Sequence, residues 1–323
     1  MYAALDLGTN NCRMLVAAPA RRGFRVVDAF SRTTRLGEGL ARTGVLSPQA
    51  MERTIDALQV CAGRMERAKV TKARYITTEV CRRAVNCDQF LDMVEERLDI
   101  RLEIISSQEE ARLALAGCAP LLSPHRPHAL VFDIGGGSTE LIWVRQLGRQ
   151  RPSIAGVLSL PFGVVTLTED PSYRFDTPEN YHAAVERIAG FLQPFECQHN
   201  ILRHIRLNRA QMLGTSGTVT TLGGIVLDLP RYDRSRVDGM VLDFEAIIMA
   251  CRALAEASHS QRAAHPCIGE ERAGLILAGC AILQAICNTW PIGRLRVADR
   301  GVREGILFHM IRSELTDAPR RSA

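Results

Sequence analysis

Two stretches of this sequence repeat one another: Leu5-Asp6-Leu7-Gly8-Thr9-Asn10-Asn11-Cys12-Arg13-Met14-Leu15-Val16-Ala17 and Phe132-Asp133-Ile134-Gly135-Gly136-Gly137-Ser138-Thr139-Glu140-Leu141-Ile142-Trp143-Val144. They align without a gap, so that Asp6 falls on Asp133 and Gly8 on Gly135. In each copy an apolar strand ends at an aspartate, the chain turns through small residues, and a second apolar strand follows. This pattern predicts a β-hairpin. The repeat therefore predicts two domains of similar fold, each of which opens with the same hairpin.

The rest of the chain alternates strands with helices, which predicts an α/β fold. Ser47-Pro48 supplies a cap residue and a first-turn proline for a helix whose apolar residues share one face. Strands are expected at 75–77, 102–105 and 211–213, and helices from about 108, after 178, after 243, from about 270 and over 301–315. Two prolines within 122–127 indicate the domain junction. The expected domains are 1–124 and 125–300, with the helix 301–315 packing back on the first.

Composition excludes several classes of protein. The 323 residues suffice for two domains, and no apolar run reaches the roughly 18 residues that a membrane span needs. Asp6 comes too early for the apolar core of a secretory signal, so a cytoplasmic protein is expected. The ten cysteines form no C-x-x-C pair, and the helical spacing of Cys280 and Cys287 is typical of reduced core residues.

The basic residues are almost all arginine. The net charge is +5, and only Lys69 and Lys72 among forty basic residues are lysines. Arginine forks match phosphate oxygens, although a biased genome composition explains the same fact equally well. No nucleic-acid recognition motif, no H-E-x-x-H and no G-x-S-x-G is present, which argues against nucleic-acid binding, histidine–metal chemistry and a serine triad.

The glycine-rich turn of the second hairpin is suited to phosphate. Three consecutive glycines remove every β-carbon, so backbone N–H groups can converge on an anion. Asp133 and Glu140 offer hard oxygen ligands for Mg2+. A glycine hairpin needed only for its turn is the alternative, but the duplication favours phosphate binding. The candidate contacts in this turn are Gly135, Gly136, Gly137, Ser138 and Thr139.

The first hairpin offers a further carboxylate, Asp6, and a set of donors. Its candidate phosphate contacts are Gly8, Thr9, Asn10, Asn11, Cys12 and Arg13, and Arg13 has the alternative of an ordinary surface residue. A third small-residue turn follows a strand and precedes the helical residues 219–223. Unsatisfied N–H groups at a helix N-terminus attract phosphate, but a Ser/Thr cap without a ligand is equally compatible. The residues of this third turn are Gly214, Thr215, Ser216, Gly217 and Thr218.

A hydrolase also needs a group that orients or deprotonates water. Ser107 and Glu110 have the S-x-x-E spacing of a capping box, and spacing alone favours that role for Glu110. A carboxylate just after a strand and beside metal-binding hairpins is the alternative, since it can orient a water for in-line attack.

Taken together, these motifs resemble the exopolyphosphatase and guanosine pentaphosphate phosphohydrolase family, within the sugar kinase, Hsp70 and actin superfamily. The resemblance spans nearly the whole chain in the family's order. It rests on the segments 6–10, 105–112, 132–141, 214–218 and 299–305. It implies two duplicated ribonuclease H-like domains with an interdomain cleft.

The resemblance also implies residue roles. Glu110 becomes the general base in place of a helix cap, Mg2+ binds near Asp133 and Glu140, and Asp6 is the candidate metal ligand of the other hairpin. Arg82 falls where the family has a substrate-contacting arginine, and Arg272 is a further candidate. Ser107 stands where the family usually has glycine, and Asn11 and Cys12 replace commoner residues. The longer members' additional C-terminal region is absent, so the chain resembles the short form.

The expected function is Mg2+-dependent release of orthophosphate from the end of inorganic polyphosphate. Conversion of guanosine pentaphosphate to tetraphosphate is the alternative within the same chemistry. An actin-like ATPase or sugar kinase, and a phosphate sensor without catalysis, are alternatives of other classes. These phosphate compounds are the expected partners, nucleic acid and membrane are not expected, and a homodimer is left open.

Overall fold

Both copies of the repeat form the predicted antiparallel hairpins. The computed structural model describes residues 1–21, 23–148 and 150–317. In the first copy β1 (Tyr2–Leu7) pairs with β2 (Asn11–Ala20), which places Asp6 opposite Arg13. In the second, β6 (His128–Ile134) pairs with β7 (Thr139–Arg145), which places Asp133 opposite Glu140.

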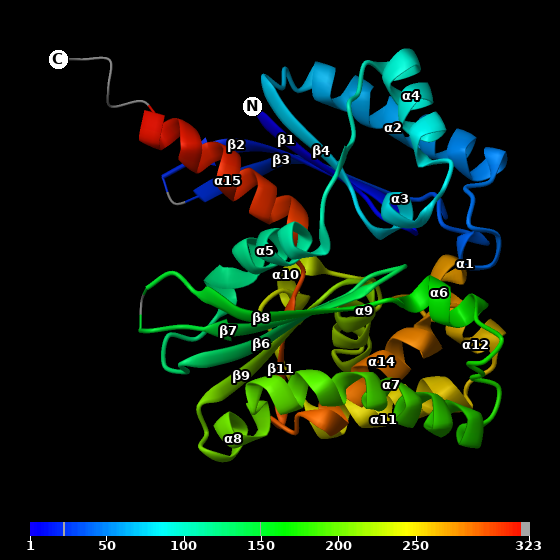
Figure 1. Ribbon diagram of the computed structural model, residues 1–323, viewed down its shortest axis with the longest axis vertical. Helices are drawn as coiled ribbons and strands as arrows, with labels where there is room; N and C mark the ends of the chain where they lie inside the picture. Colours follow the sequence, from blue (N-terminus) through cyan, green and yellow to red (C-terminus); the bar gives the residue numbers. More distant parts are fainter. Residues whose placement is uncertain (22, 149, 318–323) are drawn as a thin grey trace. The chain divides into compact units, whose positions relative to one another are not determined.

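Each hairpin lies within its own mixed sheet (Figure 1). The first sheet has the order β3-β2-β1-β4-β5, with β3 (Gly23–Thr33) antiparallel and with β4 (Lys72–Thr77) and β5 (Glu103–Ile104) parallel. The second has the order β10-β11-β9-β6-β7-β8. Its remaining strands are β8 (Ser153–Leu160), β9 (Ala210–Thr215), β10 (Val241–Asp243) and β11 (Arg294–Ala298). Both sheets therefore contain three antiparallel strands followed by two parallel ones.

The duplication reaches to single residues. The pairing register shifts between Val16 and Ala17 in β2 and between Trp143 and Val144 in β7. These two irregularities occupy equivalent positions in the gapless alignment of the repeat. A β-bulge bends its strand and increases its twist, so both sheets carry the same local bend.

The chain divides into two units. Met1–Gly117 and the segment from Gly301 onward form the first, and Cys118–Arg300 forms the second. The chain therefore crosses from the first unit into the second before it reaches the two prolines within 122–127. It returns to the first unit immediately before α15 (Val302–Asp317), which packs on β1, β2 and β3 of the first unit.

In the first unit, α2 (Pro48–Arg67) and α4 (Cys87–Leu98) share one core with the sheet. The Ser47 hydroxyl accepts a hydrogen bond from the Ala50 N–H at 3.2 Å, which confirms the predicted cap of α2. The shorter helices are α1 (Leu40–Thr43) and α3 (Glu79–Arg83), and α5 (Ser107–Cys118) follows β5.

Two glycines allow α5 and α15 to approach closely. A β-carbon at Gly117 would lie 2.0 Å from the Gly301 carbonyl oxygen, and one at Gly305 would lie 2.0 Å from that of Leu113. Contacts this short with backbone atoms leave room only for glycine. The C-terminal helix is therefore fixed to the first unit at its first turn.

In the second unit a large core lies between the sheet and helices α7 (Pro178–His199), α9 (Gly217–Val226), α11 (Phe244–Glu256) and α14 (Ile276–Thr289). Figure 1 shows α7, α11 and α14 together on the same side of the strands. The shorter elements are η1 (Ala119–Leu121), α6 (Val164–Glu169), α8 (Ile201–Arg206), α10 (Arg234–Val237), α12 (His259–Ala264) and α13 (Glu270–Ala273).

The single helix expected from about residue 270 is wrong, because α13 ends at Ala273 and α14 begins at Ile276. The Ala273 carbonyl accepts a hydrogen bond from Arg262 Nε at 3.2 Å instead of continuing a helical ladder. Gly274, a poor helix former, follows directly.

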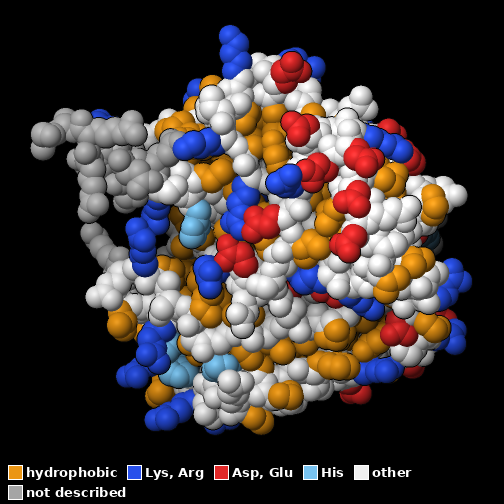
Figure 2. Space-filling view, turned by 45° about the horizontal axis from the view of Figure 1, so that its top comes forward, with side chains coloured by type: hydrophobic (Ala, Val, Ile, Leu, Met, Phe, Trp, Pro, Cys, Tyr) orange, Lys and Arg blue, Asp and Glu red, His pale blue; other side chains and the backbone are white. Residues whose placement is uncertain are grey.

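The cysteines are reduced thiols, as their spacing predicted. All ten cysteines are free thiols, and all but Cys197 are buried, including Cys280 and Cys287 in the second core. Among the helices of the described residues, none combines the length and apolarity that crossing a membrane requires. Figure 2 shows acidic and basic side chains interspersed at the upper right and histidines beside basic side chains at the lower left.

Candidate active site

The turn of the first hairpin has its carbonyl groups occupied and its N–H groups available. The Thr9 carbonyl accepts from the Gly37 N–H at 2.9 Å, and the Asn10 carbonyl accepts from the N–H groups of Thr34 and Arg35 at 2.9 and 3.0 Å. Gly37 is required here, because a β-carbon would lie 2.3 Å from Thr9 Cγ2. Within the described part of the chain, the N–H groups of Thr9 and Asn10 have no hydrogen-bond partner. Such a turn is prepared to bind an anion.

The glycine turn of the second hairpin is arranged in the same way. The Gly136 carbonyl accepts from the Val165 N–H at 2.8 Å, at the start of α6. A β-carbon at Gly163 would lie 2.3 Å from the Gly135 carbonyl oxygen, so only glycine permits this contact. The N–H groups of Gly136 and Gly137 have no partner among the described residues.

One further bond closes each turn identically. The Gly8 N–H donates to the Asn11 carbonyl at 3.0 Å, and the Gly135 N–H donates to the Ser138 carbonyl at 2.9 Å. These four residues are equivalent pairs in the repeat. Each unit therefore contains a turn closed by the same main-chain hydrogen bond.

Some side chains expected to bind phosphate are used inside the fold. The Cys12 thiol is fully buried and lies 4.0 Å from the Cys61 sulfur of α2, so the expectation that Cys12 contacts phosphate is wrong for its side chain. The Thr139 hydroxyl is fully buried and donates to the Phe162 carbonyl at 3.0 Å. The two turns thus offer backbone N–H groups more than side-chain donors.

The strand ends carry the charged groups. Directly opposed residues of an antiparallel pair project from the same face, so Asp133 and Glu140 are neighbours. Glu140 is 2% exposed and accepts from the Ser159 hydroxyl at 3.1 Å. At the equivalent place in the first hairpin Asp6 faces Arg13.

The pKa of Asp6 is raised, chiefly because the carboxyl is buried, and Arg13 and Arg303 oppose that rise. A second carboxyl, Glu304, acts in the same direction as burial. An additional positive charge near Asp6 would therefore stabilise its ionised form.

A magnesium ion fits the paired carboxylates of the second hairpin. The described residues contain no group of three or more His, Cys, Asp or Glu side chains that could hold a metal. An ion at Asp133 and Glu140 would need further oxygen ligands from water and substrate. Mg2+ is the ion that commonly binds in this way, through one or two carboxylates, waters and substrate phosphates.

Glu110, the candidate base, is held by an arginine. Its carboxylate accepts from Nη1 and Nη2 of Arg82, both at 3.0 Å. Arg82 also donates to Glu79 at 3.2 and 3.3 Å and to the Ile105 carbonyl at 2.7 Å. All three charged side chains are largely buried, with 14–19% of each exposed. Arg82 and Glu110 were predicted from the sequence, whereas Glu79 was missed, although its i, i+3 spacing from Arg82 indicates the contact.

The helix cap predicted at Ser107 lies one residue earlier. The Ser106 hydroxyl accepts from the Glu109 N–H at 3.2 Å, and Ser107 is already the first residue of α5. The S-x-x-E spacing therefore misidentified the cap, and the Glu110 carboxylate accepts from Arg82.

The third turn is shorter than the sequence suggested. Gly214 and Thr215 belong to the strand β9. A β-carbon at Gly214 would lie 2.5 Å from the Phe132 ring. The Thr215 hydroxyl donates a hydrogen bond to the Arg300 carbonyl at 2.7 Å. Thr218 is buried and faces Gly279 of α14. The side chains of Thr215 and Thr218 are therefore used inside the second unit, whereas phosphate binding by the backbone N–H groups of this turn stays a prediction.

Ser216 remains as the distinctive residue of that turn. It precedes α9 with a φ of 100° and makes no side-chain cap. Its buried hydroxyl has no hydrogen-bond partner within the described residues. A strained residue with an unsatisfied hydroxyl at a helix N-terminus favours the anion-site interpretation over the cap.

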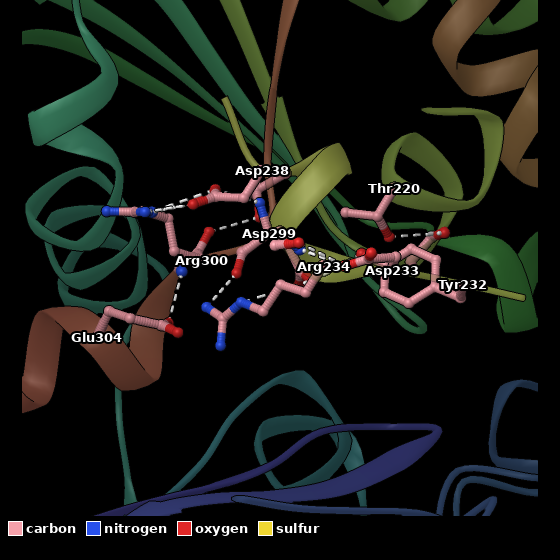
Figure 3. Close-up of polar contacts among 12 residues, drawn as sticks. Thr220, Tyr232, Asp233, Arg234, Asp238, Asp299, Arg300 and Glu304 are labelled. Carbon is pink, nitrogen blue, oxygen red and sulfur yellow. Dashed lines mark hydrogen bonds and ion pairs between the residues drawn. The ribbon is translucent and has the colours of Figure 1, made fainter. Parts of the chain in front are cut away.

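A polar network fixes the end of β11, as Figure 3 shows. The Tyr232 hydroxyl donates to Asp299 at 2.6 Å, and the Asp299 N–H donates to Asp238 at 3.0 Å. The Arg300 guanidinium also binds the Asp238 carboxylate, and burial together with Asp299 raises the pKa of Tyr232. This network holds the strand end from which the chain continues into α15.

Arg272 contacts the helix that follows the third turn. Its Nη1 donates to the buried Thr221 hydroxyl in α9 at 3.0 Å. The remainder of the guanidinium is exposed at the surface of α13.

The duplicated mixed sheets and their twin turns define an α/β protein built from two similar units, and its family profile is that of a phosphatase. The chain belongs to the Ppx/GppA phosphatase family, whose profile matches residues 15–314. This result confirms the resemblance and the fold class that the motifs indicated.

Known proteins support this assignment. A crystal structure of the Aquifex aeolicus member of the Ppx/GppA family aligns with a TM-score of 0.78 at 28% identity, covering 97% of this chain and 98% of that one. A candidate exopolyphosphatase from Haemophilus influenzae is 26% identical, covering 95% of this chain and 90% of that protein. A guanosine-5'-triphosphate,3'-diphosphate pyrophosphatase from Aliivibrio fischeri is 31% identical, covering 96% of this chain and 59% of that protein. The chain therefore spans only about three fifths of the last relative.

Proposed function

We propose that this phosphatase is an exopolyphosphatase, which removes the terminal phosphate of inorganic polyphosphate as orthophosphate in a Mg2+-dependent reaction. The observation that carries the proposal is the pair of equivalent turns, each with two backbone N–H groups that have no hydrogen-bond partner among the described residues, at Thr9 and Asn10 or at Gly136 and Gly137. A substrate made of identical phosphoryl groups suits two turns that present the same kind of backbone donors.

The proposed reaction is a direct attack by water. Glu110 accepts a proton from the water while the water oxygen bonds to the terminal phosphorus. The bond between that phosphorus and the bridging oxygen breaks. The shortened polyphosphate leaves on that oxygen. Arg82 neutralises the terminal phosphoryl oxygens, and its contact with Glu110 keeps the base beside the reacting group. Mg2+ held by Asp133 and Glu140 would supply charge neutralisation at the phosphate chain.

Guanosine pentaphosphate is the second candidate substrate. Two relatives of 29% and 31% identity are named as guanosine-5'-triphosphate,3'-diphosphate pyrophosphatases, although this chain covers only 59% of each. This substrate also ends in a phosphoanhydride, so the same turns and the same base would serve it.

Phosphate release from four substrates tests the proposal: long-chain polyphosphate, tripolyphosphate, guanosine pentaphosphate and ATP, each with Mg2+ and with EDTA. We expect the highest kcat/KM with polyphosphate in Mg2+. A preference for guanosine pentaphosphate would replace the proposal with the second candidate. ATP consumption that requires an added acceptor would indicate a kinase, and binding of polyphosphate without phosphate release would indicate a sensor.

A further inference from the structure

A cavity lies in the second unit, away from the glycine turn. It has a volume of about 540 Å³, and its polar or aromatic wall consists of His128, Trp143, Arg145, Gln198, His199 and His204. This size is within the usual range of roughly 300–1,000 Å³ for small-molecule sites. His128 begins β6 and Asp133 lies near the other end of that strand. At about 3.3 Å per residue, the cavity is therefore roughly 17 Å from the carboxylates of the turn.

Flat rings form the inner wall of this cavity. The His128 ring stacks on Trp143 with centroids 5.1 Å apart and an interplanar angle of 4°. The His204 ring lies 4.0 Å from that of His128 and 5.6 Å from that of Trp143. Aromatic and imidazole faces of this kind are the surfaces on which planar heterocycles stack.

The two inner imidazoles retain hydrogen-bonding capacity. His128 Nδ1 and His204 Nδ1 are buried and have no hydrogen-bond partner in the part of the chain described. Burial lowers the pKa of His128 to about 4 and also lowers the pKa of His204, so both rings are neutral at pH 7. A neutral imidazole has one donor and one acceptor nitrogen.

The third histidine is accommodated by a glycine. A β-carbon at Gly156 of β8 would lie 2.2 Å from His199 Nε2, so any other residue there would displace the ring. His199 also meets Phe195 edge-on at 4.6 Å. Packing therefore fixes the position of the His199 ring in the cavity wall.

The entrance carries positive charge. Arg145 is an exposed member of the wall, and Arg203 and Arg209 also act electrostatically on His204. Glu196 is the acidic group that opposes them there. An arginine beside stacked rings suits a ligand that joins a flat heterocycle to an anionic group.

From these observations we propose that the cavity is a binding site for a purine nucleoside monophosphate, with the base against His204 and His128 and the phosphate at Arg145. The site lies apart from the proposed catalytic groups and does not depend on the proposed polyphosphatase activity.

Titration of guanosine monophosphate into the full-length E110Q variant in EDTA tests this site, by calorimetry and by tryptophan fluorescence. The chain has two tryptophans, and Trp290 is fully buried, so a fluorescence change would report chiefly on Trp143. We expect saturable binding and quenching. Guanosine and inorganic phosphate, which each provide half of the ligand, should bind at least about tenfold more weakly because they lack either the charge-assisted contact or the stacking.

Three variants locate the bound nucleotide. R145Q should weaken guanosine monophosphate at least about tenfold and leave guanosine unchanged, because only the phosphate contact is lost. H204A should weaken both. R206Q, which changes an exposed arginine of α8 outside the wall, is the matched control. No binding up to millimolar nucleotide, or equal binding by R145Q and the parent protein, would overturn the proposal. Phosphatase activity of the unmodified protein is measured separately, so each idea can fail alone.

Discussion

At the scale of single residues, the principal finding is the contact between Glu110 and Arg82. A largely buried carboxylate with a bidentate arginine has a defined position, and Glu79 holds the same guanidinium from another side. The sequence identified Glu110 only through a family resemblance, because its spacing from Ser107 favoured a cap. The structure assigns that cap to Ser106.

Replacing the proposed base tests its role. E110Q should lower kcat for phosphate release by about a hundredfold or more, the usual range for a general base, with little change in substrate affinity. E109Q is the control, since Glu109 is adjacent and pairs with Arg74 and Arg112. Initial rates with polyphosphate measure both. Equal rates for E110Q and E109Q would assign Glu110 a structural role.

At the scale of elements, close backbone contact decides where helices lie. Gly305 in α15 meets the Leu113 carbonyl of α5, whereas a β-carbon at Gly190 in α7 would meet nothing within 4 Å. Both glycines thus lie within helices, but Gly305 is at a close backbone contact and Gly190 has open space beside it.

Alanine at these two positions should change the free energy of unfolding in opposite directions. G305A forces the helices apart and should cost about 1–3 kcal/mol, the usual range for overpacking. G190A should stabilise by about 0.5–1 kcal/mol, because alanine favours a helix where no contact is disturbed. Thermal melting curves compare the two variants. A melting temperature of G305A equal to that of the parent protein would contradict the close contact.

The partly buried imidazole of His128, at the start of β6, makes the stability of the fold depend on pH. The folded pKa of His128 is about 4, below its ordinary value of 6.5, because burial disfavours the charged ring. His204, Arg145 and Arg209 lower it further, and the Val144 backbone opposes them. The unfolded state therefore binds the proton more readily, and this contribution to stability is present above pH 6.5 and lost as the pH falls toward 4.

Stability should accordingly decrease from pH 7 to pH 5 by about 1–2 kcal/mol through this ring, after allowance for its partial exposure. H128F keeps a ring beside Trp143 but cannot bind a proton. Urea unfolding at both pH values measures the difference. An equally steep decline in H128F would show that other groups cause it.

At the scale of the whole molecule, duplication supplies an equivalent hairpin turn in each unit. Both turns use a segment after the third strand to occupy their carbonyls, and both leave two N–H groups available. Among the differences between the copies, Arg13 opposite Asp6 in the first corresponds to Glu140 opposite Asp133 in the second. Of the two copies, the second is therefore the one in which two carboxylates stand opposite each other.

Removal of divalent metal tests this asymmetry. EDTA should reduce phosphate release to background, and excess Mg2+ should restore it, because the charge of the phosphate chain would otherwise remain unneutralised. The melting temperature should change little, since the two carboxylates lie on strands already joined by backbone hydrogen bonds. Rates and melting curves are recorded on the same samples. Full activity in EDTA would contradict a metal at Asp133 and Glu140.

By itself the sequence determined the twin hairpins, the α/β class, the cap at Ser47 and the family. Each of these depends on neighbouring residues along the chain, whose periodicity and turn chemistry act locally. Tertiary structure alone decided the orientation of Cys12 and Thr139 into the fold, the break at Gly274, and the contacts of Arg82 with Glu79 and Glu110. These outcomes depend on which surface a side chain meets, and packing between distant segments sets that surface.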